Sequence, residues 1–559
     1  MLRDALINRL LWARMQVFTW THWRPFVKAA RAPMDTQQRL LLKILGQNHK
    51  TKFGQAHRFD QIRSYRDFVT SVPIQNYESL RPLIDEQERT GAAALNAHTP
   101  VMYAQTSGTT GQPKLIPLLE STLRLHKHSQ AIQSYVQFKA DPQAYYGKLL
   151  GIVGLAEEGR LESGRPYGSA SGHVYKNMPT LTRAKYVIPH EVFAIEDYDL
   201  KYLVILRLAL VHRDITFLGS ANPSTFLKLL SVLEDHREEL LEDIRNDGFR
   251  HLDKMSGETR SAIGPRLRCE PARFRELQKL LGSPAPKFAD LWPKLRLVNT
   301  WTGGSCAIAL AAFETHLPTT TRIAELGYLS SEFRGTITVD VERNLGAPTI
   351  HENFFEFVER EDWEEGDKEP LTVDAIEEGK EYYLIVTTGA GLYRYFMNDI
   401  ISVTGRFHAT PTMRFVQKGK GVTNITGEKL YESQVISAVC AAEDELGVRS
   451  PFFMMLADSK ESTYRLAMER SNPNDASLNR IRTVIESKLA EVNVEYAAKR
   501  ASGRLRELEL VDLRPGTGEA YKRHCLDRGQ REGQFKIIAL QYQDDCSFPF
   551  GDYHNRDFN

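Results

Sequence analysis

A run of hydroxyl and glycine residues is the part of the sequence best suited to chemistry. It reads TSGTTGQPKLIP and spans residues 106–117. Its glycines let backbone amides approach an anion closely, its hydroxyls donate further hydrogen bonds, and Lys114 adds a positive charge. An expected strand before it (99–104) and an expected helix after it (118–138) would point amide groups at a polyphosphate. The predicted nucleotide contacts are Thr106, Ser107, Gly108, Thr109, Thr110 and Gly111, with Lys114 as a catalytic cation.

The spacing of this loop differs from the two best-known phosphate-binding patterns. In a P-loop the lysine directly follows the second glycine and precedes Ser or Thr, and Lys114 meets neither condition. The GxGxxG pattern of dinucleotide-binding folds is missing as well. The later GKGVTNITGEK (419–429) fits neither spacing. A flexible polar turn is the alternative interpretation of residues 106–114.

The segment TSGTTGQPK resembles the signature loop of the adenylate-forming superfamily, which includes acyl-CoA synthetases, peptide-synthetase adenylation domains and luciferases. Its extension to LIP is more similar to the plant and bacterial acyl acid–amido synthetases, the auxin-conjugating Gretchen Hagen family. Further segments resemble that family in the expected order: VPIQNYESLRP (72–82), LEDIR (241–245), GYLSSE (327–332), FEF (355–357), GLYRYFMND (391–399) and GQFK (533–536). The resemblance covers nearly the whole chain, and we expect a bacterial member of the family.

The resemblance implies an adenylate-forming, luciferase-like fold of the α/β class. Such a fold has a large N-terminal domain with αβ and β-barrel parts and a small mobile C-terminal α+β domain. The order of elements agrees with it, because helical segments alternate with short apolar strands. The loop-like residues 419–427 mark the expected hinge, so we predict domains at 1–423 and 424–559.

Several elements are predicted from periodicity and flanking residues. Helices are expected over 2–90 with interruptions, 225–246, 432–442 and 479–491. Strands are expected at 215–218, 295–300, 336–341, 353–358, 382–388, 452–457 and around 535–539. The acidic run 359–369 is interpreted as a solvated hairpin or loop.

The resemblance also assigns the chemistry, which is adenylation of a carboxylic acid by ATP. The acid oxygen attacks the α-phosphorus and pyrophosphate leaves. Because both partners are anions, positioning and charge neutralisation are the main tasks, and no protein nucleophile is required. Glu332 is implied as the Mg²⁺ ligand, since Mg²⁺ favours one or two carboxylates together with phosphate oxygens. Lys536 is implied as the mobile lysine that offsets charge in the adenylation step.

The remaining nucleotide contacts follow from the same resemblance. Tyr328 is expected to stack on adenine, with Ser330 or Ser331 nearby, and Asp399 to accept hydrogen bonds from the ribose hydroxyls. Lys418 stands where relatives usually carry arginine, so it keeps the charge without the bidentate fork. The family glycine before Asp399 is Asn398 here, and asparagine tolerates unusual backbone angles. The turn with Gly303 and Gly304 is expected to border the nucleotide.

In the second step an amine, expected to be an amino acid, attacks the acyl carbonyl and AMP leaves. No side chain stands out as the base for this step. By analogy, Ser107 and the segment SASGHVYKNM (169–178) are expected to contact the acid. Two alternatives remain open: an acyl-CoA ligase with the same first step, and a nucleotide-binding regulatory protein without catalysis. The joint presence of Lys114, Glu332, Asp399 and Lys536 favours an enzyme.

Length and composition limit the number of domains, the partners and the cellular compartment of the protein. At 559 residues the chain is too long for one hydrophobic core. Its 72 basic and 71 acidic residues nearly balance, which excludes the strong overall positive charge that attracts nucleic acid. Five cysteines without CxxC spacing are typical of a reducing, cytoplasmic protein. We expect a monomer whose partners are a small carboxylic acid and an amine.

The N-terminal segment MLRDALINRLLWARMQVFTWTHW (1–23) is apolar and aromatic, but Arg9 and Arg14 interrupt it. No stretch is long enough to span a bilayer. We interpret the segment as an amphipathic helix that packs on the domain, with attachment to a membrane surface as the alternative.

Overall fold

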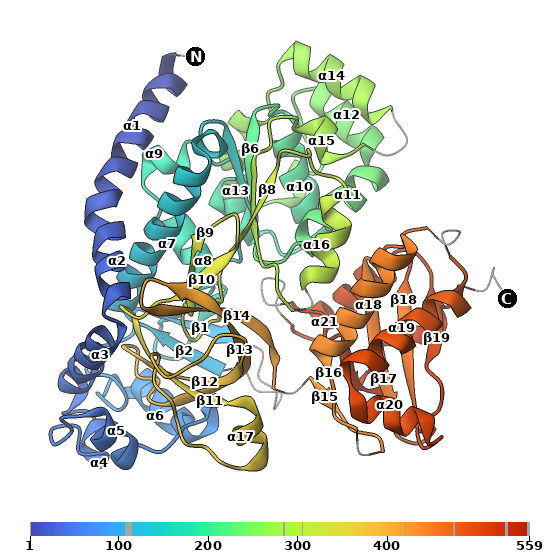
Figure 1. Cartoon of the computed structure of the whole chain (residues 1–559). Coiled ribbons are helices and arrows are strands. Elements are labelled where there is room, and N and C mark those ends of the chain that lie inside the picture. The colour runs from blue at the N-terminus through green and yellow to red at the C-terminus, as the bar shows by residue number, and fades with distance from the viewer. Residues whose placement is uncertain are drawn as a thin grey trace.

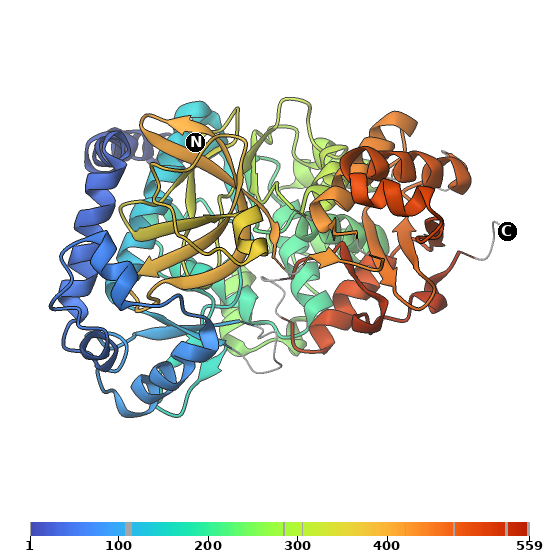
Figure 2. The ribbon, with the colours of Figure 1, turned by 60° about the horizontal axis from the view of Figure 1, so that its bottom comes forward.

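The computed structural model describes residues 2–106, 114–282, 286–304, 306–419, 421–426, 428–472, 476–530 and 535–555. Residues Ser107, Gly108, Thr109, Thr110 and Gly111 of the predicted phosphate loop therefore lie outside the described residues. Figure 1 shows helices around several small sheets, with the C-terminal elements gathered at one side. Figure 2 shows the C-terminal elements at one side of the molecule from a second direction as well.

A parallel sheet lies at the centre of the first half of the chain. Its order is β3 (Lys148–Gly151), β6 (Ile215–Gly219), β7 (Leu297–Thr300) and β8 (Arg322–Glu325). One face packs on α10 (Tyr198–Leu210) and α11 (Ser224–Asp235). The other face packs on α7 (Glu120–Ala140). Successive side chains such as Leu149 and Leu150 enter opposite cores, as a strand buried on both faces requires.

A second sheet is antiparallel and forms the floor of the site described below. Its order is β11 (Asn353–Glu359), β12 (Glu381–Thr388), β13 (Tyr395–Phe407) and β14 (Thr410–Lys418). The hairpin of β9 (Thr336–Asp340) and β10 (Leu345–Pro348) lies against β14. The second core combines this sheet with α3 (Pro33–Asn48), α4 (Lys52–Ala56), α5 (Tyr65–Ser71) and α6 (Tyr77–Thr90).

The predicted phosphate loop connects two strands of a third sheet, ordered β2-β1-β5-β4. β1 (Met102–Thr106) pairs antiparallel with β2 (Lys114–Leu118), so the Thr106 backbone lies opposite Lys114. The partners β5 (Pro166–Gly168) and β4 (Gly159–Arg160) follow. The expected helix from residue 118 was placed too early, because buried Ile116 and Leu118 belong to β2 and the helix begins at Glu120.

The C-terminal elements build a separate sheet and core. The sheet order is β19 (Glu509–Leu513), β18 (Thr463–Glu469), β17 (Phe452–Asp458) and β20 (Leu540–Tyr542). The helices are α18 (Glu432–Leu446), α19 (Leu478–Val492), α20 (Val494–Ala501) and α21 (Thr517–Asp527). A small hairpin, β15 (Val422–Thr423) with β16 (Leu430–Tyr431), spans the predicted boundary. We refer to residues 428–555 as the C-terminal unit; the boundary at 423/424 stays a prediction.

Three expectations about single elements were wrong. The helix expected over 225–246 is two helices, α11 and α12 (Arg237–Arg245), because the chain turns at His236. The acidic run contains a short helix, α17 (Arg360–Glu365), which ends at Gly366 in the left-handed region. Residues 535–539 are not a strand, since β20 begins only at Leu540.

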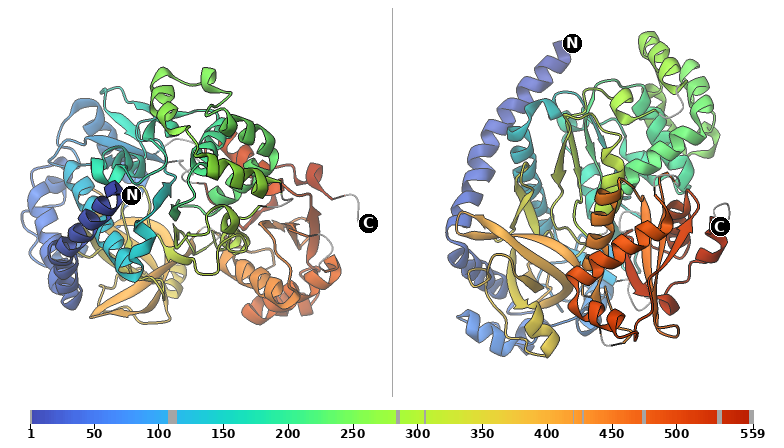
Figure 3. Two further views of the ribbon diagram at one scale, coloured as in Figure 1. Left: turned by 90° about the horizontal axis from the view of Figure 1, so that it is seen from above. Right: turned by 45° about the vertical axis from the view of Figure 1, so that its right-hand side comes forward.

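The N-terminal helices run along the outer edge of the molecule. They are α1 (Leu2–Phe18), a π-helical turn η1 (Thr19–Trp23) and α2 (Arg24–Arg31). Figures 1 and 3 show α1 beside α7, with its far side turned away from the body. Among the described residues, no helix is long and apolar enough to cross a membrane.

Candidate active site

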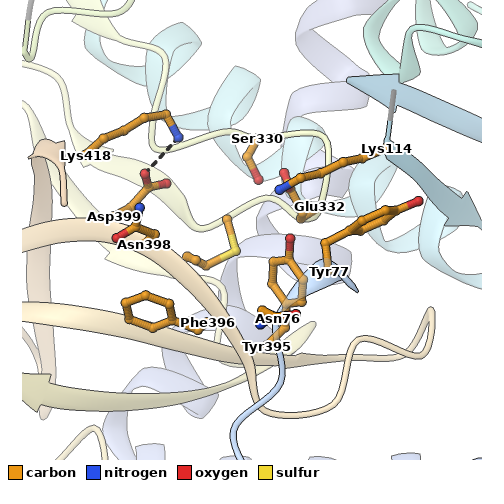
Figure 4. A pocket seen from close by; sticks show the side chains of 11 residues that line it. Asn76, Tyr77, Lys114, Ser330, Glu332, Tyr395, Phe396, Asn398, Asp399 and Lys418 are labelled. Atoms are coloured by element: carbon orange, nitrogen blue, oxygen red, sulfur yellow. Dashed lines mark hydrogen bonds and ion pairs between the residues drawn. The ribbon is translucent and has the colours of Figure 1, made fainter. Parts of the chain in front are cut away.

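A cavity of about 330 Å³ lies where β13, β14, β2 and the start of α6 meet. Figure 4 shows its polar side chains converging from these elements. Five residues predicted for the site line it: Lys114, Ser330, Glu332, Asp399 and Lys418. The other lining residues are Asn76, Tyr77, Tyr395, Phe396, Met397 and Asn398.

Asp399 and Lys418 form the best-defined part of the cavity wall. They face each other across β13 and β14, with Lys418 Nζ 3.1 Å from Asp399 Oδ1. The carboxylate is almost fully buried, whereas the lysine side chain is 60% exposed. The Asp399 charge holds the pKa of Lys418 above its usual value. A buried carboxylate thus stands fixed at the cavity with one side-chain cation beside it.

Tyr328 lies directly behind Asp399. Its hydroxyl donates to Asp399 Oδ2, and its ring stacks on Phe415 with centroids 5.7 Å apart. Burial, reinforced by the Asp399 charge, raises the pKa of Tyr328 well above 10. Tyr328 is 8% exposed and is not among the cavity-lining residues.

Asn398 occupies the position where the family pattern has glycine. Its φ of 53° lies in the left-handed region, which asparagine tolerates better than most residues. Its backbone carbonyl accepts from Gly419 N at 2.9 Å. The local backbone of the family segment is therefore compatible with the Asn398 departure.

Lys114 and Tyr77 form the opposite wall. Lys114 Nζ lies 5.4 Å from the centroid of the Tyr77 ring. The Tyr77 hydroxyl accepts from Leu115 N at 2.6 Å, which ties the start of α6 to the start of β2. Sequence reasoning missed Asn76 and Tyr77 as site residues, although the segment 72–82 was recognised as resembling the family.

Lys536 lies outside the cavity lining. Its Nζ sits between two rings, 4.5 Å from the centroid of Trp301 and 4.9 Å from that of Phe415. We call this pair of rings the aromatic slot. Because Phe415 also stacks on Tyr328, one aromatic layer separates the lysine from the tyrosine that contacts Asp399.

The segment around Lys536 is held by hydrogen bonds at Phe535 and Ala539, and the Ala539 carbonyl accepts from Met455 N at 2.8 Å. Asn222 Nδ2 donates to Phe535 O at 2.9 Å, and Ala539 N donates to Glu432 Oε1 at 2.6 Å. Burial raises the pKa of Glu432 to about 7, although the charges of Lys536 and Lys418 oppose the rise. Glu432 thus links the lysine segment to the first turn of α18.

The other described residues predicted for the site do not line the cavity. Gly304, at φ 58°, places its backbone against the Phe415 ring, and a Cβ on Gly303 would lie 3.1 Å from Phe415 O. Ser331 is not among the lining residues. The segment predicted to contact the acid contains α8 (Ala170–Lys176), capped by Ser169, and it does not line the cavity.

Comparison of the fold identifies its class. A solved structure titled "GH3.15 acyl acid amido synthetase" superposes with a TM-score of 0.82 at 22% identity, covering 94% of this chain and 95% of that one. A 2-hydroxyisobutyryl-CoA ligase in the postadenylation state with 2-HIB-AMP gives 0.52 at 12% identity, covering 92% and 90%. The predicted α/β fold of adenylate-forming enzymes is confirmed.

The sequence identifies the family within that class. The GH3 family N-terminal domain matches residues 23–321, the central domain 347–418 and the C-terminal domain 433–543. The chain belongs to the GH3 family, as the resemblance of its motifs implied.

Two relatives from Arabidopsis thaliana illustrate the similarity. The indole-3-acetic acid-amido synthetase GH3.15 is 28% identical over 545 residues, covering 89% of each chain. The 4-substituted benzoates-glutamate ligase GH3.12 is 24% identical, covering 91% of this chain and 94% of the relative. These relatives are plant proteins and give no support to the expectation of a bacterial member.

Proposed function

We propose that this GH3 chain is an ATP-dependent acyl acid–amido synthetase. It activates a carboxylic acid as acyl-AMP and transfers the acyl group to the amino group of an amino acid. One observation carries the proposal: Lys114, Glu332, Asp399 and Lys418 converge on one cavity, with Lys536 one aromatic layer behind its wall. The amido synthetase names of the relatives support the same reaction.

The arrangement suits the binding and neutralisation of two anions. In this proposal Asp399 accepts hydrogen bonds from the ribose hydroxyls, and the contact with Lys418 Nζ at 3.1 Å holds that carboxylate in place. Lys114, at the end of the phosphate loop, offsets phosphate charge from the opposite wall. Lys536 offsets charge that develops as the acid oxygen attacks the α-phosphorus.

Glu332 is the proposed holder of Mg²⁺. Its side chain lines the cavity beside Ser330, where it would hold the ion together with phosphate oxygens of the nucleotide. Bound there, Mg²⁺ would neutralise phosphate charge and help to orient the pyrophosphate leaving group. Glu332 would thereby supply a carboxylate ligand of the kind that Mg²⁺ favours.

The proposal also covers the setting of the enzyme. We place it in the cytoplasm as a monomer, in keeping with five free cysteines. A homogeneous mass by light scattering and a cytosolic distribution of tagged chain would support this; a stable oligomer would contradict it.

Acid-dependent ATP–pyrophosphate exchange with Mg²⁺ and no amine is the test. Aryl, indole, jasmonate-like and fatty acids would form the panel. Exchange with some acids is the expected result, and amide formation with amino acids in preference to thioester formation with CoA would complete it. ATP binding without exchange for every acid would contradict adenylation, whereas CoA preference would make the chain an acyl-CoA ligase.

A further inference from the structure

The outer face of α1 and η1 carries exposed apolar side chains that the enzyme site does not use. Among the described residues, nine large apolar side chains are exposed, and five of them fall within residues 6–20. They are Leu6, Leu10, Trp12, Val17 and Trp20, exposed by 46–61%. Scattered single residues of this kind are ordinary, whereas a concentration on one helix indicates a docking surface.

This helix has two apolar faces. Ile7 and Met15 are buried, and Met15 packs with Tyr135 and Val136 of α7. That contact accounts for one face. Leu6, Leu10 and Val17 follow one another at spacings of four and seven residues, which places them on a second common face. Packing on α7 therefore does not explain why the outer face is apolar.

The charge around this face is one-sided. Residues 5–34 contain no Asp or Glu, but they contain Arg9, Arg14, Arg24, Lys28 and Arg31. The whole chain has a net charge of only +1, so this segment is a local concentration of positive charge. A partner that complements this face must carry negative charge and also offer an apolar region for the exposed side chains.

Two features favour a lipid surface over a protein partner. Trp20 and Trp12 are exposed, and tryptophan is the residue type enriched at membrane–water boundaries. The Arg24 guanidinium lies 3.2 Å from the Trp20 ring centroid, so a cation stands beside the largest exposed ring. A second copy would bring the same arginines together with no carboxylate in residues 5–34 to pair with them.

We propose that α1 and η1 form a docking face for an anionic membrane surface, lying in the headgroup region without crossing the bilayer. Leu6, Leu10, Val17 and Trp20 enter the boundary between headgroups and acyl chains, and the exposed Arg9 and Arg24, the first residue of α2, contact lipid phosphates. Figures 1 and 3 show α1 along the outer edge of the molecule, and none of the described helices or strands lies outside it. The inference does not depend on the proposed amide synthesis.

Vesicle flotation of the full chain tests the proposal. Phosphatidylcholine vesicles containing phosphatidylserine should carry the chain upward, and vesicles of phosphatidylcholine alone should carry much less. Raised salt should weaken binding, because it screens attraction to the charged surface. Absence of binding to either vesicle, or equal binding to both at every salt concentration, would overturn the proposal.

Variants locate the binding. Leu10→Ser/Val17→Ser/Trp20→Ser should lower partitioning about tenfold or more, and Arg9→Gln/Arg24→Gln should weaken binding to anionic vesicles alone. The matched control Val492→Ser/Val494→Ser removes exposed apolar side chains of the C-terminal unit and should leave binding unchanged.

Thermal unfolding and ATP–pyrophosphate exchange would confirm that each variant is folded. Wild-type binding by the triple variant would overturn the proposal. A dimer in light scattering that the triple variant abolishes would instead make this face a contact between copies.

Discussion

The two sides of the proposed active site are built differently. The wall with Asp399 and Lys418 belongs to adjacent strands of one sheet, whose register fixes both side chains. Lys536 lies on a segment without regular structure, held by hydrogen bonds at Phe535 and Ala539 and by the aromatic slot. The recognition side is thus formed in advance, while a separate unit supplies the lysine. Such a division allows the lysine to move while the binding cavity stays intact.

Contacts between the C-terminal unit and the parallel-sheet region agree with this difference. Arg523 Nη2 lies 2.9 Å from both oxygens of Asp199, and Lys228 contacts both Asp199 and Glu519. Arg523 and Asp199 are each about half exposed. The exposed Arg523–Asp199 pair stabilises weakly, so it can hold one arrangement without preventing another, whereas the Lys228 side chain in the other two pairs is only 6% exposed.

The largest effect is expected from a substitution in the preformed wall of Asp399 and Lys418. Asp399→Ala removes the proposed ribose acceptor and leaves Lys418 and the Tyr328 hydroxyl without their common partner. ATP–pyrophosphate exchange should fall about 100-fold or more, with weaker nucleotide binding by calorimetry. The control Asp362→Ala, on exposed α17, should retain both. Unchanged nucleotide affinity in the Asp399 variant would exclude the ribose role.

Lys536→Ala tests the lysine that the C-terminal unit supplies. Exchange should fall about 100-fold, whereas nucleotide affinity should stay within about twofold of the wild type, because the lysine acts on charge in the transition state. Lys536→Arg should recover part of the rate. Equal losses of affinity and rate would show that Lys536 belongs to the ground-state binding side.

Glu332→Gln should raise the Mg²⁺ concentration needed for half-maximal exchange by about tenfold, since a neutral amide is a weaker ligand than a carboxylate. A Mg²⁺ titration of both proteins measures this shift. Superimposable titration curves would remove Glu332 from the metal site.

Glu432, which accepts a hydrogen bond from the lysine segment at Ala539, should make the stability of the fold depend on pH. Burial raises its pKa to about 7, so the folded state binds a proton that the unfolded state has released between about pH 4.5 and 7. This contribution to stability is complete below the unfolded pKa and is lost as the pH rises through about 7. The thermal midpoint should therefore fall less with rising pH in Glu432→Gln than in the wild type.

Glu443 is the matched comparison, because burial also raises its pKa to about 7 and it lies on the same helix. Glu443→Gln should show a similar loss of pH dependence without altering exchange kinetics. A wild-type pH profile in Glu432→Gln would contradict the assignment of this titration to Glu432.

The smallest effect is expected at the contact between the units. Asp199→Asn removes the charge that Arg523 and Lys228 share, and stability should change by less than about 1 kcal/mol. The salt dependence of turnover should become shallower if these ion pairs govern movement of the unit. An unchanged salt profile would assign them no part in the motion.

Several parts of this fold were readable from local patterns. The strands at 215–218, 353–358 and 452–457 were recognised because short apolar runs are flanked by turn residues. The break at His236 was not, since both sides have helical periodicity and only packing separates α11 from α12. Lys536 was expected on a strand because its neighbours are apolar. In the structure Phe535 and Ile537 pack in the C-terminal core without joining the sheet.

The sequence by itself determined the family, the α/β class and the residue types of the site, because motifs in a fixed order record chemistry independently of packing. Only the tertiary structure decided which residues meet. The Asp399–Lys418 pair depends on the β13–β14 register, and Tyr77 reaches Lys114 through a contact between α6 and β2. Likewise, Lys536 and the two rings of the aromatic slot come from three distant segments. Such contacts arise from long-range packing, which no local pattern encodes.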